Sequence, residues 1–326
     1  MENTMSRTLL PLTILTALMG ETALAEVPRV VADIAPIHSL VARVMEGVGT
    51  PELIVQPGAS PHEYSLRPSE AEALQEADLV FWVSPDLTPW LESAIETLAT
   101  RASVTELLEA EGTIELKMRE GALFEVHNHG EDEQGGDDHV DETFDDEAGH
   151  EDHDNHGAHD PHAWLSPQNA TTWLNVIASQ LSAVDPANAT AYFANAATGR
   201  AELDTLTGDI NTMLAPVRGG QFIVFHDAYQ YFEFAFEFRA SGAISISDAS
   251  DPSPARIVEI RKRIAAEGID CVLAEPQFNQ SLVATVLDGT EAKRGVLDPL
   301  GSDLKPGSNL YPQLMRNLAS TLVKCM

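Results

Sequence analysis

The chain has 326 residues and a formal net charge of −32. So large an excess of negative charge excludes nucleic acids and anionic membrane surfaces as expected partners. The length is sufficient for two ordinary lobes.

The first 25 residues have the pattern of a secretory signal peptide. Arg7 precedes the short apolar run 9–20, and Ala23-Leu24-Ala25 forms a cleavage pattern. The apolar run is shorter than the roughly 20 residues that a membrane-spanning helix needs. The residue directly after the cleavage pattern is Glu26 rather than cysteine, so we expect no lipid anchor. These features predict an exported protein of the periplasm, without direct membrane insertion.

Strands and helices alternate in the first part of the mature chain. The apolar run 29–35 predicts a buried strand, and 38–49 predicts a helix ended by glycine. Ser69 and Glu72 have the spacing of a capping box, which predicts a helix that begins at Ser69. The alternation is typical of βαβ units with a parallel sheet. The other elements predicted here are strands within 51–58 and 78–84 and a helix over 89–99.

This pattern stops at residues 125–160, which contain fifteen acidic residues, seven histidines and no Lys or Arg. With almost no apolar residues, the segment cannot bury enough surface to offset its ordering entropy. We predict a disordered insertion. Its histidines stand among carboxylates without fixed spacing, a composition that binds divalent ions loosely. We interpret it as an auxiliary metal-binding loop, the alternative being a solvated linker. The histidines are His127, His129, His139, His150, His153, His156 and His159.

The second half returns to an α/β pattern. A helix is predicted over 168–184, and one long helix over 186–216, which at about 1.5 Å per residue is long enough to cross between two lobes. The remaining predicted elements are a strand and helix within 219–236, a helix and buried strand within 253–278, a helix over 279–290, a strand within 293–301 and a last helix over 311–326. The predicted fold class is therefore α/β, with mainly parallel sheets in an N-terminal lobe (26–185, containing the loop 125–160) and a C-terminal lobe (217–326), joined by the linking helix 186–216.

Outside the acidic segment, three of the four histidines share a position relative to the predicted elements. His62 lies in the loop after a strand, His162 precedes a helix, and His226 ends a strand. Ligands of open parallel sheets collect at the carboxyl ends of strands, often between lobes. Asp298 also ends a strand, and three imidazoles with one carboxylate suit zinc. We interpret the fourth histidine, His38, as structural.

Each of these residues also has a structural interpretation. A single histidine at a strand end can be a hydrogen-bonded core residue, and Asp298-Pro299 can initiate a turn.

Five segments in this order resemble the metal-binding solute receptors of ABC transporters, specifically the zinc-uptake type. They are GASPHEYSLRPSEA (58–71), DPHAWLSPQNA (160–170), FHDAYQYF (225–232), AEPQF (274–278) and LDPLG (297–301). The resemblance covers essentially the whole mature chain and implies two α/β lobes joined by one long rigid helix. It implies Zn²⁺ ligands at His62, His162 and His226, with the acid ligand of many relatives at Asp298. It also implies a receptor that delivers Zn²⁺ to a membrane permease of an ABC transporter, and we expect a monomer.

Two positions bear on the metal and its fourth ligand. Some zinc receptors of this type have a glutamate just before the first ligand histidine, where this chain has Pro61. The fourth ligand is therefore either Asp298 or a water molecule, and we favour Asp298. Manganese receptors of the family tend to have glutamate in place of His226. Imidazole there favours zinc, since harder oxygen ligands suit manganese.

The chain has two cysteines, Cys271 and Cys325. In an oxidising compartment we expect them to pair, the alternative being two buried thiols. The resemblance to the zinc-type receptors also implies this pairing, since some of them have a disulfide at the matching positions.

Three other functions compete with a zinc receptor. A secreted zinc hydrolase would need an open zinc position and a general base, but the sequence has no H-E-x-x-H stretch and offers only Glu63 as a base. We therefore expect no enzyme. A manganese or iron receptor of the same fold is the closer alternative, and a role as an adhesin can coexist with transport. We expect Glu63, Tyr64, Arg67 and Trp164 to support the site.

Overall fold

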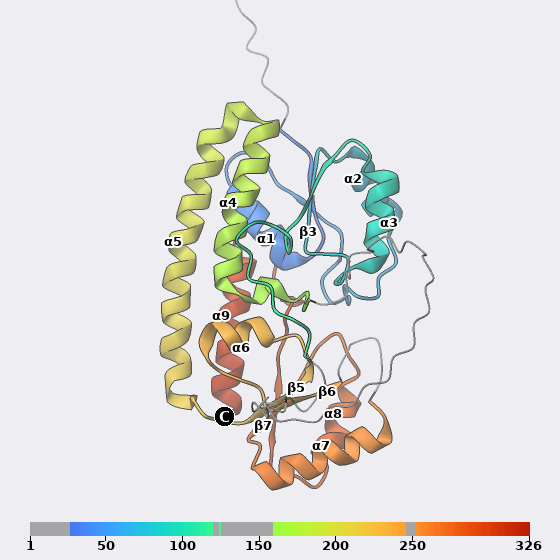
Figure 1. Cartoon of the computed structure of the whole chain (residues 1–326), viewed down its shortest axis with the longest axis vertical. Coiled ribbons are helices and arrows are strands. Elements are labelled where there is room, and N and C mark those ends of the chain that lie inside the picture. Colours follow the sequence, from blue (N-terminus) through green and yellow to red (C-terminus); the bar gives the residue numbers. More distant parts are fainter. Residues whose placement is uncertain (1–26, 120–123, 125–158, 246–251) are drawn as a thin grey trace, which may run out of the picture.

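The computed structural model describes residues 27–119, 124, 159–245 and 252–326. Two lobes, each with a parallel four-stranded sheet and covering helices, are connected by one long helix (Figure 1). The predicted fold class is confirmed. The predicted signal peptide and most of the acidic segment, including His127, His129, His139, His150, His153 and His156, lie outside the described residues.

The N-terminal sheet has the strand order β2-β1-β3-β4, and all its pairs are parallel. The central strands β1 and β3 are buried along their whole length, which explains their continuous apolar sequence. The elements of this part are β1 (Val30–Ala32), α1 (Ala35–Val44), β2 (Glu52–Leu53), α2 (Pro68–Glu76), β3 (Leu79–Trp82), α3 (Pro89–Leu98), β4 (Ser103–Glu106) and α4 (Pro167–Val184).

The start of α2 differs from the prediction. The helix begins at Pro68, and Arg67 rather than Ser69 is the N-cap residue. Proline is well suited to the first helical position because its missing N–H needs no partner there. The Glu70 carboxylate accepts hydrogen bonds from the Arg67 backbone N–H and the Tyr64 hydroxyl, both at 2.8 Å. Glu70 therefore takes the capping role that we expected of Glu72.

The long helix is α5 (Ala189–Leu214), whose 26 residues extend about 39 Å along both lobes (Figure 1). Its buried residues recur at helical spacing and pack against α4 and the last helix, α9 (Leu310–Cys325). Gly199 permits the close contact with α4, since a Cβ atom there would lie 2.9 Å from Leu174 Cδ1.

One hydrophobic core extends through both lobes. Ala32 and Val41 in the first lobe, Leu206 on α5, and Val224 and Leu314 in the second belong to a single cluster of buried side chains. Because close-packed interiors resist deformation, the lobes are held as a unit on this side of the molecule.

The C-terminal sheet repeats the arrangement, with order β6-β5-β7-β8 and only parallel pairs. Its elements are β5 (Phe222–His226), α6 (Gln230–Phe236), β6 (Gly242–Ser245), α7 (Pro254–Glu267), β7 (Cys271–Ala274), α8 (Gln280–Leu287) and β8 (Lys293–Val296). Within the described parts of the chain, no helix combines the length and apolar character that crossing a membrane requires.

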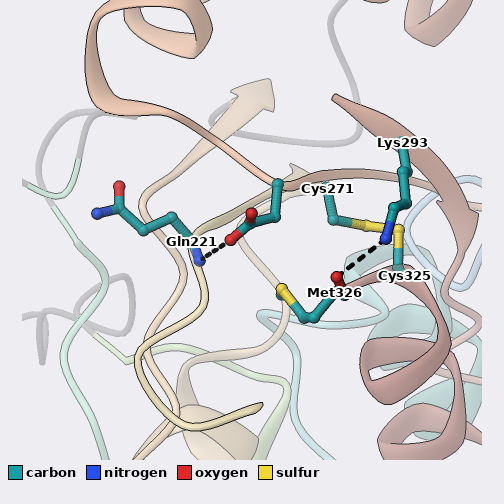
Figure 2. Close-up of a disulfide and its surroundings, with 6 residues drawn as sticks. Gln221, Cys271, Lys293, Cys325 and Met326 are labelled. Carbon is teal, nitrogen blue, oxygen red and sulfur yellow. Dashed lines mark hydrogen bonds between the residues drawn. A yellow bond between two sulfur atoms is a disulfide. The ribbon is translucent and has the colours of Figure 1, made fainter. Parts of the chain in front are cut away.

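A disulfide between Cys271 and Cys325 joins β7 to the end of α9, as predicted (Figure 2). Lys293 on the neighbouring strand donates a hydrogen bond from Nζ to the backbone oxygen of Met326 at 2.9 Å. Gly295 leaves room for the bridge, because a Cβ atom there would lie 2.6 Å from Leu273 Cδ2 and 3.2 Å from Cys325 Sγ. The C-terminus is thus fixed to the second sheet.

Asp33 connects two strands of the first sheet and should make stability depend on pH. Its buried carboxylate accepts hydrogen bonds from the backbone N–H groups of Ile34 and Val83. Burial raises the pKa of Asp33 to about 7 against the opposing effect of these bonds. The folded state therefore keeps a proton that the unfolded state releases near its ordinary pKa, so this group destabilises the fold as pH rises.

We expect Asp33 to lower the free energy of unfolding by about 2 kcal/mol between about pH 5 and pH 7. Denaturant titrations at several pH values, compared with Asp33→Asn, measure this slope. Asp33→Asn has one hydrogen-bond acceptor fewer at every pH. Its free energy of unfolding should nevertheless fall less steeply with rising pH than that of the wild-type protein over this range. Identical slopes would show that Asp33 ionises normally in the folded protein.

Candidate metal centre

The structure brings His62, His162 and His226 together where the two lobes meet. His62 lies in the loop between β2 and α2, and His162 is the residue before a short 3-10 turn (Ala163–Leu165). His226 is the last residue of β5. One ligand nitrogen from each of the three lies within 4.8 Å of the others. His162 and His226 are 5% and 4% exposed, while His62 is half-buried and is the most exposed of the three.

The spacing of the two buried imidazoles fits a zinc ion. The Nε2 atoms of His162 and His226 lie 3.4 Å apart. In a tetrahedral site with zinc–nitrogen distances of about 2.0–2.1 Å, two ligating nitrogens are about 3.3–3.4 Å apart. The ring centroids of His162 and His226 are 5.2 Å apart, and the centroid of His62 lies 5.5 Å from that of His162 and 6.4 Å from that of His226.

A buried carboxylate orients each of these two imidazoles. His162 Nδ1 lies 2.7 Å from Asp160 Oδ1, and His226 Nδ1 lies 2.7 Å from Glu275 Oε1. Such a bond fixes the tautomer, so that Nε2 presents its lone pair to the metal, and it makes the imidazole a stronger base. Burial raises the pKa of Asp160 to about 7, and burial likewise raises the pKa of Glu275, partly offset by His226. A bound cation would favour the ionised form of both carboxylates.

Asp298 does not join the three histidines. Its Oδ1 accepts hydrogen bonds from the backbone N–H groups of Leu300 and Gly301 and from Gln277 Nε2, at 2.9–3.1 Å, and its Oδ2 accepts from Ser302 N. The carboxylate thus organises the turn after β8, which is the structural alternative that Asp298-Pro299 offered. Its assignment as the fourth ligand stays a prediction, and ligation requires it to exchange these hydrogen bonds for the metal.

The supporting residues differ from those we expected. Of the four residues expected to support the site, only Trp164 lines the pocket that contains the three histidines. Its Nε1 donates a hydrogen bond to the Pro299 carbonyl at 2.8 Å. Glu63 is exposed, while Tyr64 and Arg67 interact with Glu70 on α2. The pocket is lined by Ser60, Pro61, His62, His162, Trp164, His226, Glu275, Gln277, Phe278, Pro299 and Leu300.

Sequence reasoning missed Asp160 and Glu275. Both stand in quoted segments, DPH and AEPQF, and Glu275 directly follows β7, the neighbour of β5 in the sheet. A carboxylate after the strand beside a ligand-bearing strand is the signal that could have identified Glu275.

Replacing Glu275 by glutamine should weaken zinc binding by about 10- to 100-fold, the usual effect of losing an outer-shell partner. The amide retains the shape but not the charge that stabilises the metal-bound imidazole. Competition against a chromophoric chelator measures the change. Asp298→Asn, tested in parallel, shows whether the carboxylate that organises the turn after β8 matters as much. Unchanged affinity in Glu275→Gln would contradict the role given to this carboxylate.

His159 belongs to a second group of candidate ligand atoms. One candidate ligand atom each from Glu109, Glu115 and His159 lies within 4.8 Å of the others; both glutamates are exposed, while His159 is half-buried. His159 pairs with Lys117 in an antiparallel bridge, and Asp160 is buried. Both residues are held in place, so the disordered segment that we predicted over 125–160 does not include them. The auxiliary role of the loop histidines stays a prediction.

Comparisons with known proteins show what this chain is similar to. The profile of a family described as ZnuA, zinc-uptake complex component A, periplasmic, matches residues 30–325. The High-affinity zinc uptake system protein ZnuA of Brucella abortus (strain 2308) is 45% identical over 314 residues, which is 94% of each chain.

Solved structures show the same fold at low sequence identity. A crystal structure of ZnuA has a TM-score of 0.73 and 20% identity, covering 92% of this chain and 99% of the other. The binding protein FpvC of Pseudomonas aeruginosa, solved in complex with Mn²⁺, has a TM-score of 0.73 and 19% identity, covering 92% and 98%. Because the profile matches residues 30–325 and the Brucella relative matches over 94% of each chain, the chain belongs to the ZnuA family of periplasmic zinc-uptake components, which are metal-binding receptors for transport.

Proposed function

We propose that this receptor binds one Zn²⁺ ion through His62, His162 and His226 in the periplasm and delivers it to the membrane permease of an ABC transporter. The observation that carries the proposal is the convergence of three distant imidazoles, two of which have Nε2 atoms 3.4 Å apart. The zinc-named Brucella relative supports the choice of cargo.

The ligand set, rather than the fold, favours zinc over manganese. A protein of the same fold was solved with Mn²⁺, so the two-lobe architecture accommodates both metals. Neutral imidazoles suit zinc, whereas manganese prefers carboxylate, carbonyl and water oxygens. The two buried carboxylates of this site, Asp160 and Glu275, are hydrogen-bonded to histidines. We therefore expect histidine nitrogens, rather than the oxygens of these two carboxylates, to bind the metal.

The pocket supports capture rather than catalysis. A zinc hydrolase needs a base that can activate a metal-bound water. Glu63, which we considered for that role, is exposed and does not line the pocket. Glu275 does line it, but its Oε1 is bonded to His226. The arrangement thus suits a site that holds and releases an ion.

Release must occur with little bending between the lobes. The shared core and the continuous helices α5 and α9 resist a large hinge motion on one side of the molecule. The ligands lie in loops and at a strand end, so small shifts of these segments can open the site. We infer that docking on the permease moves the half-buried His62 loop first.

A zinc-bound crystal structure with anomalous scattering at the zinc edge tests the proposal. The expected result is one strong anomalous peak bonded to the three histidine Nε2 atoms, with Asp298 or a water completing the tetrahedron. Competition between Zn²⁺ and Mn²⁺ should favour zinc strongly. A peak elsewhere, or preference for manganese, would contradict the proposed function.

A further inference from the structure

A single guanidinium joins the two lobes beside the metal centre. Arg119 follows β4 in the N-terminal lobe and donates from Nε to both carboxylate oxygens of Asp227, at 3.0 and 2.9 Å. It also donates to both oxygens of Glu233 on α6, at 2.8 and 3.1 Å. The side chains of Arg119, Asp227 and Glu233 are 20%, 11% and 3% exposed. Charge-assisted, bidentate pairs shielded from water in this way fix geometry strongly.

The chain segment just before Arg119 is hydrogen-bonded to α6, the helix that carries Glu233. Leu116 N donates to the Tyr231 hydroxyl at 2.9 Å, and Gln230 Nε2 donates to the Lys117 carbonyl at 3.0 Å. On its other side, this segment pairs with the residues before His162, since Asp160 N donates to the Leu116 carbonyl at 2.7 Å. Residues 116–119 are therefore held between α6 and Asp160.

The contacts of residues 116–119 lead on one side to His226 and on the other to His162. Asp227 directly follows His226 in the chain. Asp160, whose backbone N–H donates to the Leu116 carbonyl, accepts from His162 Nδ1 at 2.7 Å. One path of hydrogen bonds and backbone thus runs from His226 through Arg119 to His162, and these two imidazoles are the pair at the spacing that zinc requires.

We propose that Arg119 is a positioning residue that sets the separation of His162 and His226, and thereby the affinity for zinc and the rate of its release. The inference rests on the proposed three-histidine site. Arg119 lies outside the pocket, and its hydrogen bonds go to Asp227 and Glu233. It acts by holding the Asp227 end of β5 against the segment that carries Asp160.

Arg43 provides a control for the loss of an ion pair between two elements, with partner side chains, Glu202 and Glu46, that are 54% and 58% exposed. Its guanidinium forms a two-bond contact with Glu202 at 2.8 and 3.0 Å and a further bond with Glu46 at 2.6 Å, and its side chain is 12% exposed. Like Arg119, it joins separate elements, here α1 and α5. It does not line the metal pocket.

The test compares Arg119→Ala, Arg119→Lys and Arg43→Ala in the full mature chain. Zinc affinity is measured by competition with a chromophoric chelator, the dissociation rate by stopped flow with excess chelator, and the melting temperature without metal. Both alanine variants should have a lower melting temperature than the wild-type protein. Only Arg119→Ala should bind zinc more weakly, by about 2- to 30-fold, and release it faster, since it acts through residues that do not themselves touch the metal. Arg119→Lys should lie between it and the wild type, because lysine keeps the charge but not the planar fork.

Wild-type zinc affinity and release rate in Arg119→Ala would overturn the inference, as would an equal loss of affinity in Arg43→Ala. If Arg119→Ala does not fold, Arg119→Lys decides: weaker binding supports the role, and wild-type binding overturns it. Failure of the proposed site is a separate result, because the wild-type chain would then bind no zinc through the three histidines.

Discussion

Tight zinc binding is expected to disappear when His62, His162 and His226 are all replaced by alanine. One nitrogen from each imidazole lies within 4.8 Å of the others. Their joint loss leaves only Asp298 of the four predicted ligands, too few to hold a tetrahedral ion. His226→Ala alone should weaken binding by more than about 100-fold, since even outer-shell partners cost about 10- to 100-fold. Calorimetric titration of the metal-free protein measures both effects.

His38→Ala is the control for these substitutions. His38 is also a buried histidine of the first lobe, but its Nε2 lies 3.0 Å from the Pro51 carbonyl and it does not line the pocket. Its loss should lower stability and leave the affinity for zinc unchanged. If the triple variant still bound one zinc ion tightly, the metal centre would have to lie elsewhere.

Removal of the disulfide should cost about 4 kcal/mol in the free energy of unfolding, from the loop-closure entropy of a 54-residue separation. The bridge joins β7 to the end of α9, and α9 packs on α5 and α1 of the shared core. Its loss therefore acts on the stability of both lobes. Denaturant unfolding of the Cys271→Ala, Cys325→Ala double variant measures the change.

Chemical reduction of the wild-type protein separates the cross-link from the packing of its sulfur atoms. Similar losses of stability in the reduced protein and in the double variant are expected if the cross-link itself is responsible. Zinc affinity should change little under conditions where the fold persists, since Glu275 is held by its bond to His226. An unchanged unfolding midpoint after complete reduction would contradict the prediction.

Much of the fold follows from local patterns. Continuous apolar runs predicted the buried strands around Val31 and Val224, and the stretch between Pro186 and Pro216 predicted the long helix that the structure shows as Ala189–Leu214. These signals depend on residues close in sequence, so they can be recognised without knowledge of the rest of the chain. The start of α2 was misplaced because Pro68 and Glu70 outweighed the equally plausible pair Ser69 and Glu72.

The candidate site was predicted only in part, for a related reason. His62, His162 and His226 could be selected because histidine is rare outside the acidic segment and these three flank predicted elements. Glu275 could not be paired with His226 without knowing that β7 lies beside β5. Asp298 was expected to face the metal, whereas the backbone N–H groups of its own turn hold its carboxylate.

The sequence by itself determined the alternation of strands and helices, the residues able to ligate zinc and the cysteines able to pair, because each is a matter of residue type and short-range spacing. The tertiary structure decided which carboxylates orient the imidazoles, how Asp298 is used and how Arg119 joins the lobes. Glu275 and His226, for example, are 49 positions apart in the chain, and only the packing of the strands and lobes sets which of such distant residues meet.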